Sequence, residues 1–427
     1  MFGKSWGVFP SANAAWLVSS EKFMRYVDFI NHLKVRLGYG ITGNDNIEDY
    51  ATHTYFSTLR QETYANGIVL SNIANPQIQW ETTYRKNAGI DLGLLNDRIS
   101  LSFDYFSGIT KDLLTLKSQP YVSGLGVYWS NGGELSNNGY EFSANFKLLN
   151  LKSLKWEFGF SVGHYENKIL SLPLINGSTD YTTSVYGGEV LTAVGQPAGM
   201  FYGYKTNGVY ATEADAASAN LYILNQNGSK SYFKAGDVRF VDGDKNGIKD
   251  GVIDANDKQI IGNPNPKLYG NITSKLSYKK LTLSTLFTYS YGNDVYNFQR
   301  SQLETGSDYS NQSTAMLSRW TAEGQHTTQP KAVYGDPMGN ARFSDRWIED
   351  GSYLRLKTVT LSYTVPIKSN FIEGFSVWIS ANNLVTFTKY LGPDPEFSAQ
   401  NSVLFQGVDV GLVPTSKSYY VGLKLNL

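Results

Sequence analysis

The sequence predicts an all-β protein, an antiparallel transmembrane β-barrel, on three observations. Segments of about ten residues alternate between apolar and polar side chains, the repeat of a strand with two different faces. Short turns and long loops alternate between these segments, and aromatic residues are abundant, with 30 Tyr, 22 Phe and 8 Trp. This combination is typical of a barrel whose apolar face meets lipid and whose polar face lines the lumen. A clear example of the alternation is the row Ile99, Leu101, Phe103 and Tyr105.

The alternating segments number eleven, and each is expected to form one strand. Short turns such as Asn96–Asp97 and Lys279–Lys280 join some of them, and long loops such as 169–266 and 292–352 join others. Outer-membrane barrels have short periplasmic turns and long extracellular loops, so the turns mark the periplasmic end. In order, the expected strands are Ser11–Glu21, His32–Gly40, Gln77–Gly93, Arg98–Thr110, Tyr140–Leu149, Lys155–His164, Lys267–Tyr278, Leu281–Tyr291, Tyr353–Val365, Phe375–Ala381 and Lys417–Leu427.

An odd number of strands has a consequence for closure. Eleven strands that begin and end in the same direction cannot close on themselves as an antiparallel barrel. An open sheet in lipid would leave backbone groups without hydrogen-bond partners. We therefore expect residues 1–427 to be the C-terminal portion of a larger barrel, whose remainder and signal peptide lie upstream.

Composition and motifs narrow the function classes. The formal net charge is zero, so nothing indicates a nucleic-acid partner, and Cys is absent, as suits an envelope protein without disulfides. The sequence has no G-x-S-x-G elbow and no Cys nucleophile, so no enzyme is predicted. Asp394 and Glu396 have the composition of a glycosidase pair, but Pro395 between them favours a structural turn.

Short phrases along the whole chain identify a family resemblance. They include Leu33–Gly40 (LKVRLGYG), Gln79–Thr82 (QWET), Gly262–Lys267 (GNPNPK) and Gly351–Lys357 (GSYLRLK). With these, the chain resembles the C-terminal part of the β-barrel in the SusC/RagA family of TonB-linked outer-membrane proteins of Bacteroidetes. The resemblance implies a 22-stranded plugged barrel, of which this chain supplies about the last half and contains neither plug domain nor TonB box.

The resemblance also implies a function. Members of such a family are TonB-dependent receptors that import oligosaccharides, glycans or peptides through the outer membrane. A SusD-like surface lipoprotein would cover the barrel as a lid, and the TonB complex would act through the N-terminal part that this chain lacks. The alternative is a soluble or surface-attached β-rich carbohydrate-binding module. That alternative predicts that the face bearing Phe103 and Tyr105 is buried against a second sheet.

An acidic segment, residues 236–257, is a candidate for structural Ca²⁺, although no cofactor is required. In one register its first ligands follow the pattern of an EF-hand loop, but Ile253 occupies position 12. In a second register the loop closes with Asp257, but Ile248 occupies position 3. The other interpretation is a solvated turn of Asp, Asn and Gly. The candidate ligands are Asp242, Asp244, Asn246, Asp250, Asp254 and Asp257.

Aromatic residues in the long loops are the candidate substrate contacts. Aromatic rings stack on sugar faces and on apolar peptide side chains. The other interpretation is that they pack the loops against one another or against a partner. These residues are Tyr121, Tyr128, Trp129, Tyr202, Tyr204, Tyr296, Phe298 and Trp320.

Overall fold

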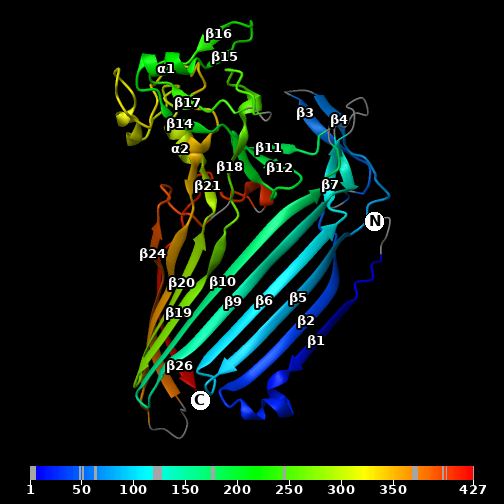
Figure 1. Cartoon of the computed structure of the whole chain (residues 1–427), viewed down its shortest axis with the longest axis vertical. Coiled ribbons are helices and arrows are strands. Elements are labelled where there is room, and N and C mark those ends of the chain that lie inside the picture. Colours follow the sequence, from blue (N-terminus) through cyan, green and yellow to red (C-terminus); the bar gives the residue numbers. More distant parts are fainter. Residues whose placement is uncertain are drawn as a thin grey trace.

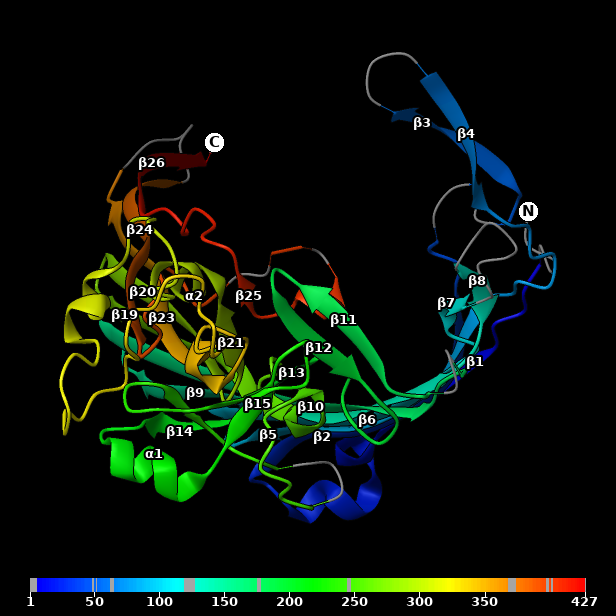
Figure 2. The ribbon, with the colours of Figure 1, turned by 90° about the horizontal axis from the view of Figure 1, so that it is seen from above.

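One antiparallel sheet of eleven strands dominates the computed structural model and curves into an open trough (Figures 1 and 2). The structure describes residues 6–47, 50, 52–61, 65–118, 127–174, 178–243, 247–367, 374–396, 399–400 and 402–426. Neighbours in the sheet follow one another along the chain, with loop elements left out. The strands are β1 (Ser11–Leu17), β2 (Ile30–Asn44), β5 (Glu81–Leu94), β6 (Ile99–Lys111), β9 (Glu134–Asn150), β10 (Leu154–Ser171), β19 (Leu268–Tyr278), β20 (Leu281–Tyr291), β23 (Tyr353–Val365), β24 (Gly374–Thr388) and β26 (Ser418–Asn426).

All eleven expected strands are present in the expected order, which confirms the prediction of the wall. Two of them, β20 and β23, have the predicted bounds. The first expected strand is too long, because the chain leaves the sheet after Leu17 and forms two 3₁₀ turns, η1 (Val18–Ser20) and η2 (Lys22–Tyr26). No helix in the described part of the chain is long and apolar enough to cross a membrane.

The two faces of the wall differ in polarity. Val35, Ile90, Phe103 and Phe142 lie directly opposite one another on four neighbouring strands and therefore share one face. Phe103 is 43% exposed on that face. Other large apolar side chains on the same face are exposed as well. This finding contradicts the carbohydrate-binding-module alternative, which requires the face to be buried against another sheet.

The short turns gather at one end of the wall, as predicted. At the β5–β6 turn Leu95, Asn96 and Asp97 have φ angles of 54°, 58° and 55°. Asn and Asp tolerate this left-handed region because their short side chains bond locally.

At the other end the long loops fold into a layer of small sheets and helices above the wall (Figure 1). Helix α1 shows why such elements form there: the Thr212 side chain accepts the backbone N–H of Asp215, and Asn220 ends the helix at a φ of 52°. The loop elements are β3 (Tyr55–Gln61), β4 (Ala65–Asn72), β7 (Leu114–Ser118), β8 (Val127–Asn131), β11 (Tyr181–Val185), β12 (Gly188–Thr192), β13 (Met200–Gly203), β14 (Thr206–Val209), α1 (Glu213–Ala219), β15 (Tyr222–Leu224), β16 (Lys230–Tyr232), β17 (Val238–Phe240), η4 (Ala255–Asp257), β18 (Gln259–Gly262), β21 (Asp294–Asn297), α2 (Phe298–Leu303), η5 (Thr314–Ser318), η6 (Asp345–Trp347), β22 (Ile348–Asp350), η7 (Val403–Phe405) and β25 (Val408–Asp409).

The hydrophobic cores of the protein lie in this loop layer rather than in the wall. One core joins three different loops through the fully or nearly fully buried residues Val185, Val190, Phe201, Tyr296, Trp347 and Val408. A second core, further from the wall, consists of Tyr210, Ala216, Phe233, Val238, Phe240 and Ile253. The external loops therefore form folded structure with its own buried apolar contacts.

Candidate functional site

The concave face of the wall is polar and hollowed. One hollow of about 580 Å³ is lined by side chains from six strands, among them Ser102, Glu141, Ser161, Asn271 and Thr288. A second, of about 560 Å³, lies closer to the periplasmic turns. Residues of six strands can share one hollow only on the concave side of a curved sheet. The polar face is therefore the concave face, and the apolar face is convex.

An ion-pair cluster is built into this concave wall. Arg36 on β2 donates from Nε to Asp91 on β5 at 2.8 Å and pairs through Nη1 with Asp104 on β6 at 2.8 Å. The Ser102 hydroxyl donates to Asp91 at 2.8 Å. Glu141 lies opposite Asp104 on the next strand. One guanidinium therefore offsets the charges of two carboxylates across three strands, while a third carboxylate stays beside them.

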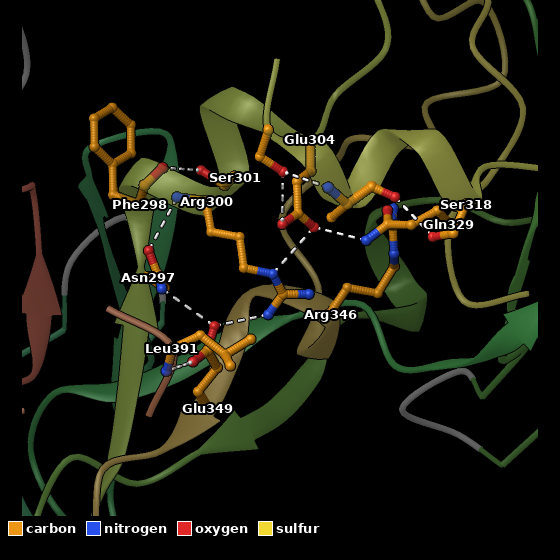
Figure 3. Close-up of polar contacts among 12 residues, drawn as sticks. Asn297, Phe298, Arg300, Ser301, Glu304, Ser318, Gln329, Arg346, Glu349 and Leu391 are labelled. Atoms are coloured by element: carbon orange, nitrogen blue, oxygen red, sulfur yellow. Dashed lines mark hydrogen bonds and ion pairs between the residues drawn. The ribbon is translucent and has the colours of Figure 1, made fainter. Parts of the chain in front are cut away.

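A second network ties the foot of the loop layer together (Figure 3). Arg300 on α2 donates to Glu304 at 3.1 Å and to Glu349 on β22 at 2.7 Å. Glu349 also accepts the backbone N–H of Leu391, and Glu304 accepts the Gln329 side-chain amide. Burial lowers the pKa of Arg300, but the hydrogen bonds and charges of both glutamates outweigh burial and leave the pKa raised.

Arg346 is a second guanidinium beside this network. It donates to the Gln329 side chain at 3.1 Å and to the Asn340 carbonyl at 2.8 Å, and it lies over the Trp347 ring at 4.6 Å. Burial, assisted by the charge of Arg300, lowers the pKa of Arg346 to about 10. Gln329 therefore connects Glu304, directly after α2, with Arg346, shortly before β22.

A third cluster fastens the last external loop to the wall. Arg355 on β23 is 2% exposed and donates to Asp394 at 2.5 Å and to Glu396 at 2.6 Å. Thr415, near the other end of that loop, donates its hydroxyl to Asp394 at 2.6 Å. Burial raises the pKa of Asp394, but the bonds from Thr415 and Arg355 outweigh burial and lower it overall. Because both carboxylates are bound by one arginine, the arrangement is that of a structural turn.

Several of the predicted loop aromatics are placed in packing positions. Tyr296 and Tyr202 are 2% and 7% exposed and belong to hydrophobic clusters, with Phe298 packed against Tyr296. The cations of Lys258 and Arg342 lie over the Tyr204 ring, at 5.9 and 4.9 Å from its centroid.

The remaining loop aromatics are less uniform in their surroundings. Trp320 donates to the Ala211 carbonyl at 3.1 Å, and its ring covers Gly236, where an added Cβ would lie 2.5 Å away. Tyr128 and Trp129 on β8 are partly exposed, and Tyr121 lies outside the described residues. Substrate contact by this set stays a prediction.

An exposed aromatic pair was not singled out from the sequence. Tyr309 and Tyr334 are 92% and 72% exposed, and their ring centroids lie 5.2 Å apart at an interplanar angle of 32°. The surrounding residues include Ser310 and Asn311. The signal that marks these two is exposure, which the sequence does not display, because aromatics also fill the loop cores.

The acidic segment is structured by its own carboxylates. Asp257 is fully buried and accepts the backbone N–H groups of Gly243 and Asp254, at 2.9 and 2.8 Å. Asp242 accepts from Gly251 through one oxygen at 2.9 Å, and its other oxygen is buried with no hydrogen-bond partner among the residues that the structure describes.

The remaining candidate ligands of that segment divide into two groups. Asp250 accepts from Val252 at 2.8 Å, and Asp254 accepts from Asn256 at 2.7 Å. Asp244 and Asn246 lie outside the described residues. Within the residues that the structure describes, no three His, Cys, Asp or Glu side chains gather as a metal site. Calcium binding stays a prediction.

Comparison with known proteins identifies the family. The family model described as "TonB dependent receptor-like, beta-barrel" matches residues 2–384. TonB-dependent receptor P3 of Formosa agariphila is 31% identical over 98% of this chain and 41% of its own length. TonB-dependent receptor SusC of Bacteroides thetaiotaomicron is 29% identical over 98% of this chain and 40% of its own length.

A solved structure shares the fold. The RagAB peptide importer in its closed-closed state superposes with a TM-score of 0.77 at 24% identity, over 98% of this chain and 43% of the matched chain. This chain thus spans well under half the length of the relatives it matches. With its eleven-stranded antiparallel wall and its match to the family model, the chain belongs to the TonB-dependent receptor β-barrel family of outer-membrane proteins, in the SusC/RagA group that its sequence resembles.

Proposed function

We propose that this chain forms part of the wall and external loops of a TonB-dependent importer for oligosaccharides, glycans or peptides. The observation that carries the proposal is the continuous polar concave wall beneath a folded loop layer. A hydroxyl- and amide-lined surface lets a polar solute pass without paying full desolvation, since each polar group finds hydrogen-bond partners along the way. No covalent step is required of any residue.

The cargo and partners follow from the relatives. The fold neighbour RagAB is named as a peptide importer, and the sequence relative is SusC. By analogy with these proteins we expect a SusD-like lipoprotein above the loop layer and energy supply through TonB, both acting on the whole protein rather than on this portion alone. These assignments are proposals.

The exposed loop surface supplies a contact for the cargo. Tyr309 and Tyr334 present two neighbouring rings to solvent, tilted by 32° to each other, in a segment with hydroxyl and amide side chains. Rings of this kind stack on a pyranose face or an apolar peptide side chain, while the neighbouring polar groups bond to hydroxyls or amides. We therefore place the first cargo contact at this pair.

Uptake by the bacterium that encodes the whole protein tests the proposal. Deletion of the gene should abolish entry of one of two fluorescent probes, an oligosaccharide pool or a peptide pool, and the wild-type gene should restore it. Deletion of TonB should have the same effect. Undiminished entry of both probes in the deletion strain would overturn the proposal, and the probe that is lost identifies the cargo class.

A further inference from the structure

The β1–β2 connection, residues 18–29, differs from the other described connections at the periplasmic end. The β5–β6 turn and the β19–β20 turn are tight, whereas this connection forms η1 and η2. It belongs to the periplasmic end because Phe29 accepts the backbone N–H of Leu95, at the β5–β6 turn, at 2.9 Å. Its length and composition call for a separate explanation.

The connection folds outward, onto the convex side of the wall. In Figure 2 its dark blue helical turns lie outside the curve of β2 and β5. The Phe23 ring lies 6.5 Å from the ring of Trp16, at an interplanar angle of 63°. Trp16 is opposite Val35, a member of the apolar row, so it too lies on the convex face. The connection is thus continuous with the lipid-facing surface.

Large aromatic side chains of this connection are exposed. Phe23, Tyr26 and Phe29 are 60%, 92% and 57% exposed, beside Trp16 at 53%. Lys22 and Arg25 are also exposed, between and beside these rings. Aromatic rings with basic neighbours favour a membrane–water interface, where the rings enter the acyl boundary and the cations reach lipid phosphates.

The backbone of the connection also suits that environment. Glu21, Met24, Val27 and Ile30 each donate their N–H to the carbonyl three residues earlier, at 3.0 to 3.3 Å. The Trp16 indole N–H is bound to Glu21 at 3.0 Å. These groups therefore need no water when the segment enters a medium of low polarity.

We propose that residues 18–29 form an interfacial anchor that inserts its rings into the periplasmic leaflet of the outer membrane and binds phospholipid headgroups through Lys22 and Arg25. The occupant is lipid rather than protein because the segment continues the convex apolar face. The proposal depends on the barrel's location and not on the identity of the cargo. It holds the rim of the wall at a fixed depth in the bilayer.

Residues 1–427 contain no Cys, so a direct test uses the whole protein with any cysteine outside these residues replaced by Ser. Tyr26→Cys is labelled with a nitroxide and reconstituted in vesicles of phosphatidylethanolamine and phosphatidylglycerol. Tyr309→Cys is the matched control, because both tyrosines are 92% exposed and the second lies in an external loop. Collision rates with oxygen, which concentrates in the bilayer, and with a water-soluble nickel complex are measured by electron paramagnetic resonance.

We expect the oxygen-to-nickel collision ratio at position 26 to exceed that at position 309 severalfold. Leu37→Cys, on the convex face of β2, gives the value for a lipid-facing wall position. Equal ratios at 26 and 309 would overturn the proposal, since the connection would then lie in water. Dipolar broadening at position 26 would also overturn it, because that signal reports a second copy of the protein at this surface.

Discussion

Replacement of Asp394 by Ala tests whether the last external loop is held to the wall by a buried ion pair. Asp394 and Arg355 each have a side chain that is 3% exposed, and Asp394 accepts four hydrogen bonds, from Arg355, Glu396 and twice from Thr415. Breaking a buried pair costs about 3–5 kcal/mol because the remaining charge is left without compensation. Glu396 remains on Arg355 at 2.6 Å, so we take the lower value of about 3 kcal/mol.

A loss of that size accelerates exchange by roughly 100-fold for amides that open with the loop. Hydrogen–deuterium exchange with mass spectrometry, on peptides that contain Thr415, measures it in the whole protein. Lys357→Ala is the matched control, since Lys357 pairs with Glu396 at 3.4 Å while both side chains are 35% exposed. Such an exposed pair contributes at most about 1 kcal/mol. Equal effects of the two substitutions would refute the reasoning.

Four further predictions concern the pH dependence at Asp394, the Arg300 network, the exposed tyrosine pair and the acidic segment. The pKa of Asp394 is lowered in the folded protein, so its contribution is present above the unfolded pKa and lost as the pH falls through the folded pKa. The exchange difference between wild type and Asp394→Ala should therefore persist at neutral pH and begin to shrink only as the pH falls below about 4, and a difference that instead vanished at alkaline pH would contradict this sign. Arg300→Ala leaves Glu304 and Glu349, 6% and 9% exposed, without their cation, and should reduce the free energy of unfolding of the loop layer by about 3–5 kcal/mol in chemical denaturation. The control is Lys111→Ala, which removes the ion pair of Lys111 with Glu134, whose side chains are 47% and 37% exposed, and should lower the free energy of unfolding by no more than about 1 kcal/mol. A loss as large as that of Arg300→Ala would contradict the importance of the buried network. The double substitution of Tyr309 and Tyr334 by Ala should weaken cargo binding by about 1 kcal/mol per ring, measured by calorimetry, while Leu317→Ala, at an 80% exposed site, should leave it unchanged. Calcium should raise the thermal unfolding midpoint of the wild-type protein, and the double substitution Asp250→Asn with Asp254→Asn should remove that increase. The control substitution Asp28→Asn should leave the increase unchanged. A midpoint that does not change with calcium would contradict the calcium prediction.

The wall could be predicted from the sequence because its strands obey a local rule. Alternation identified every strand, but it underestimated those that extend beyond the apolar band. The strand expected at Tyr140–Leu149 begins at Glu134, because Ser136, Asn137 and Asn138 are polar on both faces and carry no alternation. Conversely, the apolar residues Val18 and Phe23 suggest that the strand continues after Leu17, although the backbone there forms 3₁₀ turns.

The loop layer could not be predicted because its contacts are distant in the chain. Strand β13 pairs with β18, whose residues lie far along the same loop, and Arg355 finds its partner at Asp394. A single local pattern does not distinguish Tyr296, which is buried, from Tyr309, which is exposed. Both are aromatic residues in a long loop, and only the tertiary packing separates their roles.

The core shared by three external loops restricts how the loop layer of this chain can change its surface. Val190, Tyr296 and Val408 come from three separate loops and pack in one cluster. A loop transplanted alone from a relative would bring only its own share of that cluster and leave cavities or clashes at the other two. Diversification should therefore proceed by exchange of all three loops as a unit, or by change at outward positions such as Tyr309 and Tyr334 that the cluster does not include.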